Sequence, residues 1–600
     1  MSDSTTPSGQ TPAENGVAGD AADVDATDAT STAGDANSVD TGEVDTSEPG
    51  ASDEATFDQE GSAPATPGTG TAAVGAVDGD SAAGASEPGA APKASRVKSP
   101  RAKNPRQQRS KPGNRARSGR VIARGSVRIL AGVIGVGVAV AALAGAALLP
   151  LPNLHIAPAA QKVTPVPADQ ERVCPGGLLD LSDATDASSL SSIGSPSIVT
   201  SVTTSIAQRS LQTPSVHGGG GAPRTISTQA DGSAARPLVA GAQSQRAQES
   251  DLAGLAAAAC GEATSDSWLV AGSTTLGSSS LVLLSNPSKV EATVDLTVYT
   301  EAGRAEAPGA RGLVVRAGSQ LVVPLTGIVP NVQASVVHIQ ASGGSVYASL
   351  QQSSVQGLAP QGVELAGPTA APAQSIVIPG MTVANVGRIT AGSDSGSSQL
   401  PSVRLLAPGT SVAHVTVTAT SETTEGVAAT SHVTMQGGTV REVTFDHLID
   451  GSYTVQVTSD VPVVAAARTV DAAAAPSGDQ SATAQAEAAT QDFAWFVASS
   501  PLGEKAMMAV PSGSAPTLHL ANTGRTDAKV TLTPKSGAAQ QVSVPAGKGV
   551  AVQVTSHGSY TIDGASGLRA SVSLTADGES SSFALNPPGP LAQPITVYPR

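Results

Sequence analysis

The chain has 600 residues, of which 40% are hydrophobic but only 2% aromatic, and two Trp, five Phe and five Tyr cannot fill one large core. The 64 Gly and 42 Pro residues, together with only 14% charged residues, exclude a compact cytosolic enzyme and indicate small modules separated by long spacers. The net charge of −15 is arranged in blocks, because residues 1–92 hold 18 acids and no Lys or Arg, whereas residues 93–128 hold 13 Lys or Arg and no acid.

The N-terminal region is predicted to be disordered. Residues 1–95 form an acidic tail in which Phe57 is the only aromatic residue, so little apolar surface is available to offset chain entropy. Residues 96–128 form a basic juxtamembrane segment without apolar periodicity. Its bases are expected to contact anionic lipid head groups, because each base near an anionic leaflet contributes about 1 kcal/mol. These lipid-contact candidates are Arg115, Arg117, Arg120, Arg124 and Arg128. The segment has no aromatic residue for base stacking, so no nucleic-acid partner is expected.

Residues 129–149 are predicted to form one transmembrane helix. This run of 21 residues carries no charge and is long enough to cross a hydrocarbon core. The bases before it place the N-terminus in the cytoplasm and the C-terminal region outside the cell. A cleaved signal peptide is the alternative, because residues 144–146 resemble a small-residue cleavage site, but 128 residues are far too many for the region that normally precedes such a segment.

Cys174 and Cys260 are the only cysteines, and both follow the predicted membrane segment. An even cysteine count in an oxidising compartment favours a disulfide, which would stabilise the fold by roughly 4 kcal/mol in the chain-entropy description. No metal site is expected, because neither thiol has further ligands nearby. Residues 150–262, rich in Ser, Thr and Gly, are interpreted as a Cys-bridged lead-in and linker with one strand at 198–202.

Internal repetition predicts three copies of one β module. Residues 281–298 align without gaps with 517–534, and a middle copy places Leu405 and Val415 where the first has Leu284 and Val294. The predicted boundaries are 263–360 for β module 1, 376–470 for β module 2, 471–491 for a linker and 492–600 for β module 3.

The apolar residues of these copies alternate with polar ones, as expected for strands with one buried face. Short strands with frequent turns predict an all-β extracellular region of tandem immunoglobulin-like β-sandwich modules. A propeller is disfavoured, since only three copies are visible and each is longer than a blade of about 40 to 50 residues.

Catalytic motifs are absent from the sequence. It contains no nucleophile elbow, Walker loop, dinucleotide fingerprint or zinc motif. The eight His residues lack metal-ligand spacing, so neither a catalytic residue nor a cofactor is predicted. A carboxylate pair for glycoside hydrolysis stays open, because separation in space decides it. Trp268 and Trp495 take matching places before the first and third copies, where each could bind a sugar face or anchor a strand.

Three short segments carry a family resemblance: Val173-Cys174-Pro175-Gly176, the Trp268 segment followed by Leu283-Leu284-Ser285-Asn286-Pro287, and Asp492-Phe493-Ala494-Trp495. They resemble an actinobacterial family of uncharacterised single-pass envelope proteins with an extracytoplasmic β-rich region. The resemblance covers roughly residues 170–600 and implies a link to envelope glycan assembly, because genes of the family often accompany glycosyltransferases. It brings no catalytic residue.

Together these observations predict a non-catalytic protein of the cell envelope, anchored in the membrane by one helix. Its β modules are expected to bind or scaffold a surface glycan or a protein partner. The alternative is an accessory subunit of a membrane glycosyltransferase or of an envelope glycan assembly system, acting through the helix and the cytoplasmic tail.

Overall fold

The computed structural model describes a folded β region and a few short segments before and after it. The described residues are 135–140, 161–163, 169–181, 190–203, 205–218, 220–230, 237–249, 251–388, 399–474, 491–585, 587 and 595–597. The predicted acidic tail and basic segment, with the five candidate lipid-contact arginines, lie outside them. Of the predicted membrane segment only 135–140 are described, and they are helical. In the part of the chain that is described, no helix is long and apolar enough to cross a membrane.

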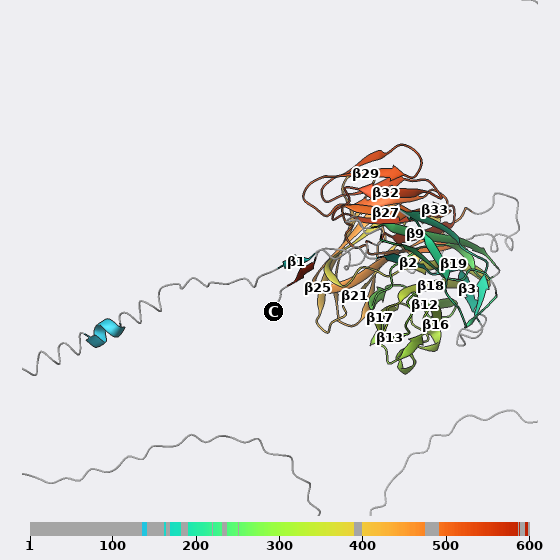
Figure 1. The fold of residues 1–600 in the computed structure, drawn as a ribbon, viewed down its shortest axis with the longest axis horizontal. Coiled ribbons are helices and arrows are strands. Elements are labelled where there is room, and N and C mark those ends of the chain that lie inside the picture. The colour runs from blue at the N-terminus through green and yellow to red at the C-terminus, as the bar shows by residue number, and fades with distance from the viewer. Residues whose placement is uncertain are drawn as a thin grey trace, which may run out of the picture. The chain divides into compact units, whose positions relative to one another are not determined.

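Module 3 shows the basic unit most simply, as eight strands in two sheets (Figure 1). The strands are β27 (Lys505–Ala509), β28 (Thr517–Ala521), β29 (Ala528–Pro534), β30 (Gln540–Val544), β31 (Gly549–Gln553), β32 (Ser559–Asp563), β33 (Arg569–Ala576) and β34 (Glu579–Ala584). One sheet has the order β27-β32-β29-β30 and the other β31-β28-β33-β34. Alternate residues of both sheets, such as Leu520, Leu532 and Val572, are buried in one shared core.

Module 1 repeats this strand order. Its strands are β11 (Asp266–Leu269), β12 (Ser278–Asn286), β13 (Ala292–Thr300), β14 (Gly303–Arg304), β15 (Leu313–Val315), β16 (Ser319–Pro324), β17 (Val336–Ser342), β18 (Tyr347–Gln356) and β19 (Ala359–Ala366), with 3-10 turns η2 (Pro308–Ala310) and η3 (Leu325–Gly327). The sheets run β11-β17-β13, with β14 and β15 both pairing with β13, and β16-β12-β18-β19. The predicted repeat between 281–298 and 517–534 is therefore a repeat of structure.

A conserved detail of the two copies explains the matching Asn286 and Asn522. Both are buried, and both donate from the side-chain amide to two backbone carbonyls, Val290 and Val315 in module 1 and Thr526 and Val544 in module 3. Each amide thereby holds the turn after its strand against the end of a neighbouring strand.

Module 2 has the same order, but one long strand takes two places. The strands are β20 (Ala373–Val383), β21 (Ser402–Leu406), β22 (Ala413–Ser421), β23 (Val427–Met435), β24 (Val440–Thr444), β25 (Gly451–Ala472) and β26 (Gln491–Val497). The first part of β25 pairs with β20 and β22, and its second part with β21 and β26. Although β26 falls at the start of the predicted module 3, it pairs with β25 and completes module 2.

Within the described residues, positions 170–259 of the region interpreted as a lead-in and linker contain nine strands, so that interpretation was wrong there. They are β2 (Gln170–Cys174), β3 (Leu178–Leu181), β4 (Leu190–Ile193), β5 (Ser197–Val202), β6 (Ala207–Ser210), β7 (Val216–His217), β8 (Arg224–Thr228), β9 (Val239–Gln248) and β10 (Ala253–Ala259). The sheets β2-β8-β6 and β5-β9-β10 follow the order of the other modules with fewer strands, and β3-β4-β7 is an insertion. We call residues 170–259 the N-terminal module.

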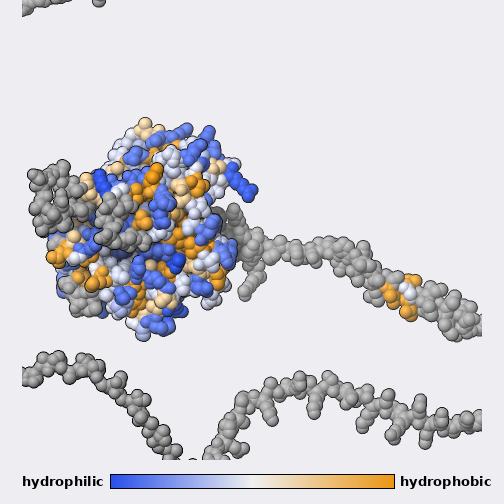
Figure 2. Space-filling model, turned by 180° about the vertical axis from the view of Figure 1, so that it is seen from behind, coloured by the Kyte–Doolittle hydropathy of each residue, from blue (hydrophilic) through white to orange (hydrophobic). Residues whose placement is uncertain are grey.

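The four modules meet around a common centre. Their last strands contact one another in a closed cycle, β10 to β19 to β26 to β34 and back to β10. Core clusters cross the module boundaries, since Leu255 of β10 packs with module 3 and Trp495 of β26 with module 1. Outside the modules, β1 (Gln161–Val163) pairs with β35 (Ile595–Val597). Where the face drawn in Figure 2 is coloured, hydrophilic and hydrophobic residues are interspersed.

Candidate functional site

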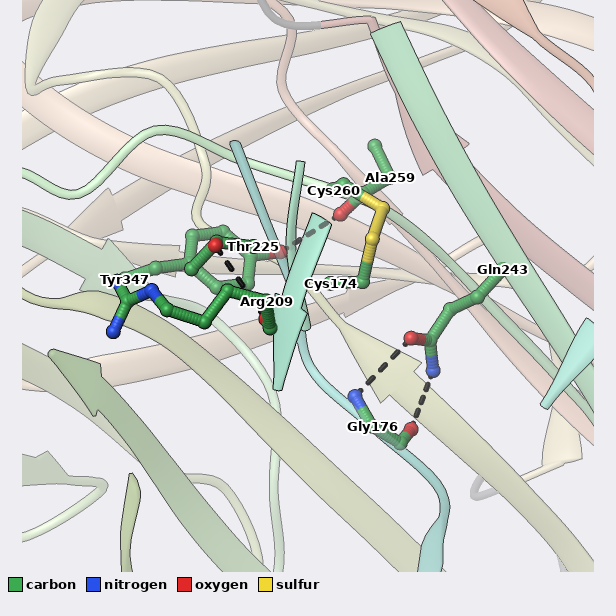
Figure 3. The surroundings of a disulfide bond; sticks show 8 residues. All are labelled: Cys174, Gly176, Arg209, Thr225, Gln243, Ala259, Cys260 and Tyr347. Carbon is green, nitrogen blue, oxygen red and sulfur yellow. Dashed lines mark hydrogen bonds between the residues drawn. A yellow bond between two sulfur atoms is a disulfide. The ribbon is translucent and has the colours of Figure 1, made fainter. Parts of the chain in front are cut away.

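The predicted disulfide between Cys174 and Cys260 is confirmed (Figure 3). Cys174 ends β2 and Cys260 follows β10, so the bond joins the first and last strands of the N-terminal module. Nearby, the Gln243 side chain accepts from the Gly176 N–H at 3.1 Å and donates to the Gly176 carbonyl at 2.5 Å. The Tyr347 hydroxyl of module 1 donates to the Ala259 carbonyl at 3.0 Å. The disulfide therefore stands where the ring of modules passes from the N-terminal module to module 1.

Trp268 is buried in module 1, with 5% of its surface exposed. Its ring stacks on His338, with centroids 3.9 Å apart and planes 7° apart, and more distantly on Tyr299. The His338 ring nitrogen lies 2.8 Å from the Asp266 carboxylate. Trp268 borders a cavity of about 250 Å³. One face of its ring is covered by His338, so a sugar cannot stack on that face.

Trp495 is 1% exposed and lies on β26 at the centre of the ring. Its indole N–H donates to the Gln352 side-chain oxygen at 2.9 Å, and Arg404 lies over its ring at 4.6 Å from the centroid. The expectation that the two tryptophans occupy equivalent places was wrong, because Trp268 is on the first strand of module 1 and Trp495 on the last strand of module 2. Their similar flanking residues do not reflect the repeat of strands.

An open cleft of about 320 Å³ lies between modules 1 and 2. Amides dominate its lining, and they come from loops and strands of both modules: Gln333, Gln352, Gln356, Gln361, Gln399 and Gln491. Three charged side chains, several Ser and Thr hydroxyls and Val470 also line it; the charged ones are Arg404 of β21, Glu442 of β24 and Arg468 of β25. We call this site the glutamine cleft.

One wall of the glutamine cleft is held rigidly by Arg404. The guanidinium of Arg404 donates to Glu442 through Nε at 2.9 Å and Nη2 at 2.8 Å, and through Nη1 to the carbonyls of Gly272 and Ser335 of module 1. Its side chain is 4% exposed. The Gln352 side-chain oxygen accepts from both the Gly272 N–H and Trp495. These contacts join the two modules behind the cleft.

The glutamines at the front of the cleft have free hydrogen-bonding capacity. Within the described ranges, the side chains of Gln333, Gln356, Gln399 and Gln491 have no hydrogen-bond partner, and all four are exposed or half-buried. Each amide can donate two hydrogen bonds and accept through its carbonyl oxygen. The arrangement can hold a polar ligand that offers both donors and acceptors. Sequence reasoning missed these residues, although the crowding of four glutamines between 351 and 361 was a signal.

Two buried carboxylates occupy the centre of the ring, and sequence reasoning missed both. Asp492 accepts backbone N–H bonds from one residue of each module, Leu255, Val363, Phe493 and Ser580, at 2.8 to 3.3 Å. Burial raises the pKa of Asp492 well above the usual carboxyl range, while the four N–H donors act in the opposite direction. The strands that meet here have edge N–H groups without a backbone acceptor, and the Asp492 carboxylate accepts their hydrogen bonds.

Glu364 serves the same region from β19. Its carboxylate accepts from the Leu365 N–H at 2.8 Å, the Ser581 hydroxyl at 2.8 Å and the Ser582 N–H at 3.3 Å. Burial raises the pKa of Glu364 well above its ordinary value, and the nearby Asp492 adds to this effect. Because every partner of the two carboxylates named here donates to them, we assign both to holding the modules together.

A Ser-His-Glu chain joins modules 2 and 3. His519 Nδ1 lies 2.6 Å from Glu422 Oε2, and His519 Nε2 lies 2.8 Å from the Ser573 hydroxyl. The contacts resemble those of a hydrolytic triad, but His519 is 0% and Ser573 2% exposed, so neither is presented to a substrate. No group of three His, Cys, Asp or Glu side chains among the described residues is placed to hold a metal ion.

Comparison with known proteins gives one finding. The sequence model of a protein family described as "Family of unknown function (DUF5719)" matches residues 215–555. The matched part begins inside the N-terminal module, just before β7, and runs past β31, so it contains β7 to β10, modules 1 and 2 and the whole glutamine cleft. It confirms the expected similarity to an uncharacterised family. No curated protein matches the chain.

Proposed function

Because the chain belongs to a family of unknown function (DUF5719), we propose its function from its own residues: the β body binds a glycan of the cell envelope in the glutamine cleft, without catalysis. One observation carries the proposal. Among the described residues, four glutamine amides without a hydrogen-bond partner line one open site, and amides offer the mixed donors and acceptors that sugar hydroxyls match. The clamp made by Arg404 keeps the site in shape before a ligand arrives, which lowers the entropy lost on binding.

The proposal includes the setting of the protein. Residues 129–149 anchor it in the membrane, the N-terminus lies in the cytoplasm, and the β body lies outside the cell. The disulfide supports this setting, since such bonds persist mainly in oxidising compartments. The modules are proposed to be immunoglobulin-like. In module 3, the second strand (β28) pairs with the fifth (β31) and the third (β29) with the sixth (β32), which supports that relationship. The seventh strand departs from it by pairing with the second.

The glycan proposal is tested with the full-length chain and purified cell-wall polysaccharide in a pull-down. The double variant Gln356→Ala with Gln491→Ala is expected to lose most of the binding, because it removes amides from both sides of the cleft. Gln541→Ala is the matched control, since Gln541 is an exposed glutamine on β30 of module 3. Equal capture of the wild type and the double variant, or no capture of the wild type, would overturn the proposal.

A further inference from the structure

The cavity of about 250 Å³ beside Trp268 lies where the N-terminal module meets modules 1 and 2. Its lining comes mainly from β2, β11 and β18 and from the connecting segments 261–264 and 368–371. Arg172 of β2 also lines it, and we call the cavity the Arg172 pocket. Pockets for drug-sized ligands usually measure about 300 to 1,000 Å³. The Arg172 pocket therefore has room for one sugar ring with its substituents, and not for an oligosaccharide.

The inner wall of the Arg172 pocket combines apolar surface with one cation. Tyr347, Ala348 and Trp268 are buried there, and so is Arg172. Burial lowers the pKa of Arg172, and the charges of Glu262 and Tyr347 oppose this effect. Since both of these residues line the pocket, the Arg172 guanidinium lies on the pocket side of its strand.

Arg172 is balanced in charge but has hydrogen bonds to donate. Its Nη1 atom lies 3.8 Å from Glu262 Oε2, which makes an ion pair but is longer than a hydrogen bond. In the described part of the chain, no oxygen accepts a hydrogen bond from the guanidinium, which carries five N–H donors. A neutral carbonyl oxygen can accept these bonds while Glu262 keeps its ion pair. An anion would instead come close to the Glu262 carboxylate, which has the same charge.

The mouth of the Arg172 pocket is formed by hydrogen-bond acceptors. The side chains of Glu262 and Asp266 are exposed on one side and line the pocket on the other. Their carboxylate oxygens can accept hydrogen bonds from the hydroxyl groups of a ligand. The pocket therefore fits a neutral ligand with an acceptor at its inner end, a small apolar group beside that acceptor, and hydroxyl groups at its outer end.

We propose that the Arg172 pocket binds one N-acylated sugar residue, with the acylamino group innermost. The acyl carbonyl oxygen accepts hydrogen bonds from the Arg172 guanidinium. The acyl methyl group lies against Tyr347 and Ala348, and the ring hydroxyls donate to Glu262 and Asp266. A plain hexose lacks both the carbonyl and the methyl group, and a uronic acid adds a negative charge beside two carboxylates. This inference goes beyond the glycan binding proposed for the glutamine cleft and does not depend on it.

Saturation-transfer NMR with the full-length chain compares four probes: N-acetylglucosamine, glucose, glucuronic acid and N-acetylalanine amide. N-acetylglucosamine is expected to bind, with the strongest transfer to its acetyl methyl protons. Glucose should bind at least about tenfold more weakly, which is the lower end of the discrimination that one missing apolar group produces in a pocket. Glucuronic acid should bind no better than glucose. Equal binding of N-acetylglucosamine and glucose would overturn the inference, and so would tighter binding of N-acetylalanine amide, which would assign the pocket to an acetylated peptide.

Two substitutions test the pocket itself, with thermal unfolding as the check on folding. Ala371→Phe places a ring at the exposed mouth and should weaken N-acetylglucosamine binding by about tenfold or more. Ala538→Phe is the matched control, because Ala538 is an exposed alanine in a loop of module 3, and it should bind as the wild type does. Arg172→Lys keeps a positive charge opposite Glu262 but loses the fork of donors, so it should weaken N-acetylglucosamine more than glucose. If Arg172→Lys does not fold, Ala371→Phe still decides the outcome.

The glutamine cleft is separated from the Arg172 pocket by the double variant Gln356→Ala with Gln491→Ala, which should bind N-acetylglucosamine as tightly as the wild type. Loss of binding in this double variant, with unchanged binding in Ala371→Phe, would place the sugar in the glutamine cleft. That result would overturn this inference and leave the glycan proposal standing. Absence of N-acetylglucosamine binding to the wild type would likewise overturn this inference alone, because the polysaccharide pull-down tests the cleft separately.

Discussion

The Asp492 carboxylate accepts a hydrogen bond from the Leu255 N–H at 2.8 Å, although 237 residues separate them. This contact joins the last strand of module 2 to the last strand of the N-terminal module, and the same carboxylate also binds an N–H group from modules 1 and 3. One side chain thus satisfies edge strands of all four modules. The closed ring depends on it, because buried N–H groups without a partner are costly.

Asp492→Ala is expected to lower the free energy of unfolding by about 3 kcal/mol or more, since each unsatisfied buried donor costs about 1 to 3 kcal/mol. Urea unfolding followed by the fluorescence of the two buried tryptophans measures the change. The stability of Asp492→Asn should fall between that of the wild type and that of Asp492→Ala, because Asn keeps one acceptor oxygen. The control is Asp527→Ala, whose carboxylate accepts only an exposed bond from the Ala546 N–H. If both alanine variants unfold at the same urea concentration, Asp492 does not hold the ring.

The role of Asp492 was not visible in the sequence because it arises from convergence. Asp492 directly precedes an apolar run. An acid in that position is as typical of the exposed start of a strand as of a buried carboxylate. Its four donors come from segments between residues 255 and 580, and no local pattern links them. The same holds for the glutamine cleft, whose amides lie on two modules.

Local periodicity, by contrast, predicted the three repeated modules well. Val294 and Leu296 are buried while Asp295 between them is exposed, as alternation requires. The N-terminal module was not predicted because many of the buried positions in its strands are Ala or Gln. In β9, Gln243 is fully buried and bonded to Gly176, and five of the seven residues of β10 are Ala. Small and amide residues do not produce an alternation of apolar and polar positions along a strand. A sequence that buries such residues therefore resembles a linker.

Glu364→Gln is expected to change how stability depends on pH. Burial raises the pKa of Glu364 above its ordinary 4.5, so the folded state binds the proton more tightly than the unfolded chain. The contribution of Glu364 to the free energy of unfolding is then complete below about pH 4.5, and it is lost as the pH rises through the pKa of the folded state. Gln keeps an acceptor for the Leu365 N–H and does not titrate. Urea midpoints between pH 5 and 8 should fall less steeply for the variant, and parallel curves would contradict the assignment.

His519→Ala tests the joint between modules 2 and 3. Burial acts to raise the pKa of Glu422, but His519 and hydrogen bonds from Thr454 and Gly380 outweigh it and hold the pKa below its ordinary value. The pair therefore stabilises the fold above about pH 4.5, and this contribution is lost as pH falls through the folded pKa. Removing His519 leaves Glu422 buried without its ring partner, at a cost of about 3 kcal/mol.

The surface offers a matched control for this pair. His414 Nδ1 lies 2.8 Å from the Asp460 carboxylate, but both side chains are largely exposed. His414→Ala should lower the free energy of unfolding far less than His519→Ala does, because polar contacts between exposed side chains contribute little. Thermal unfolding at pH 7 compares the two variants. A loss at His519 no larger than at His414 would show that the buried pair does not join the modules.

Gly362→Ala is expected to disturb the centre of the ring from the other side. Gly362 has a φ of +118°, and a Cβ there would lie 2.6 Å from the Asp492 Oδ1 atom and 2.7 Å from the Phe493 ring. Gly357 in the same hairpin also has a positive φ, +63°, but a Cβ there would meet nothing within 4 Å. Gly357→Ala therefore reports backbone strain alone, of order 1 kcal/mol, whereas Gly362→Ala adds the clash with Asp492. Urea midpoints should rank wild type, Gly357→Ala and then Gly362→Ala. Equal losses in the two variants would mean that the close approach of β19 to Asp492 adds nothing to the stability of the ring.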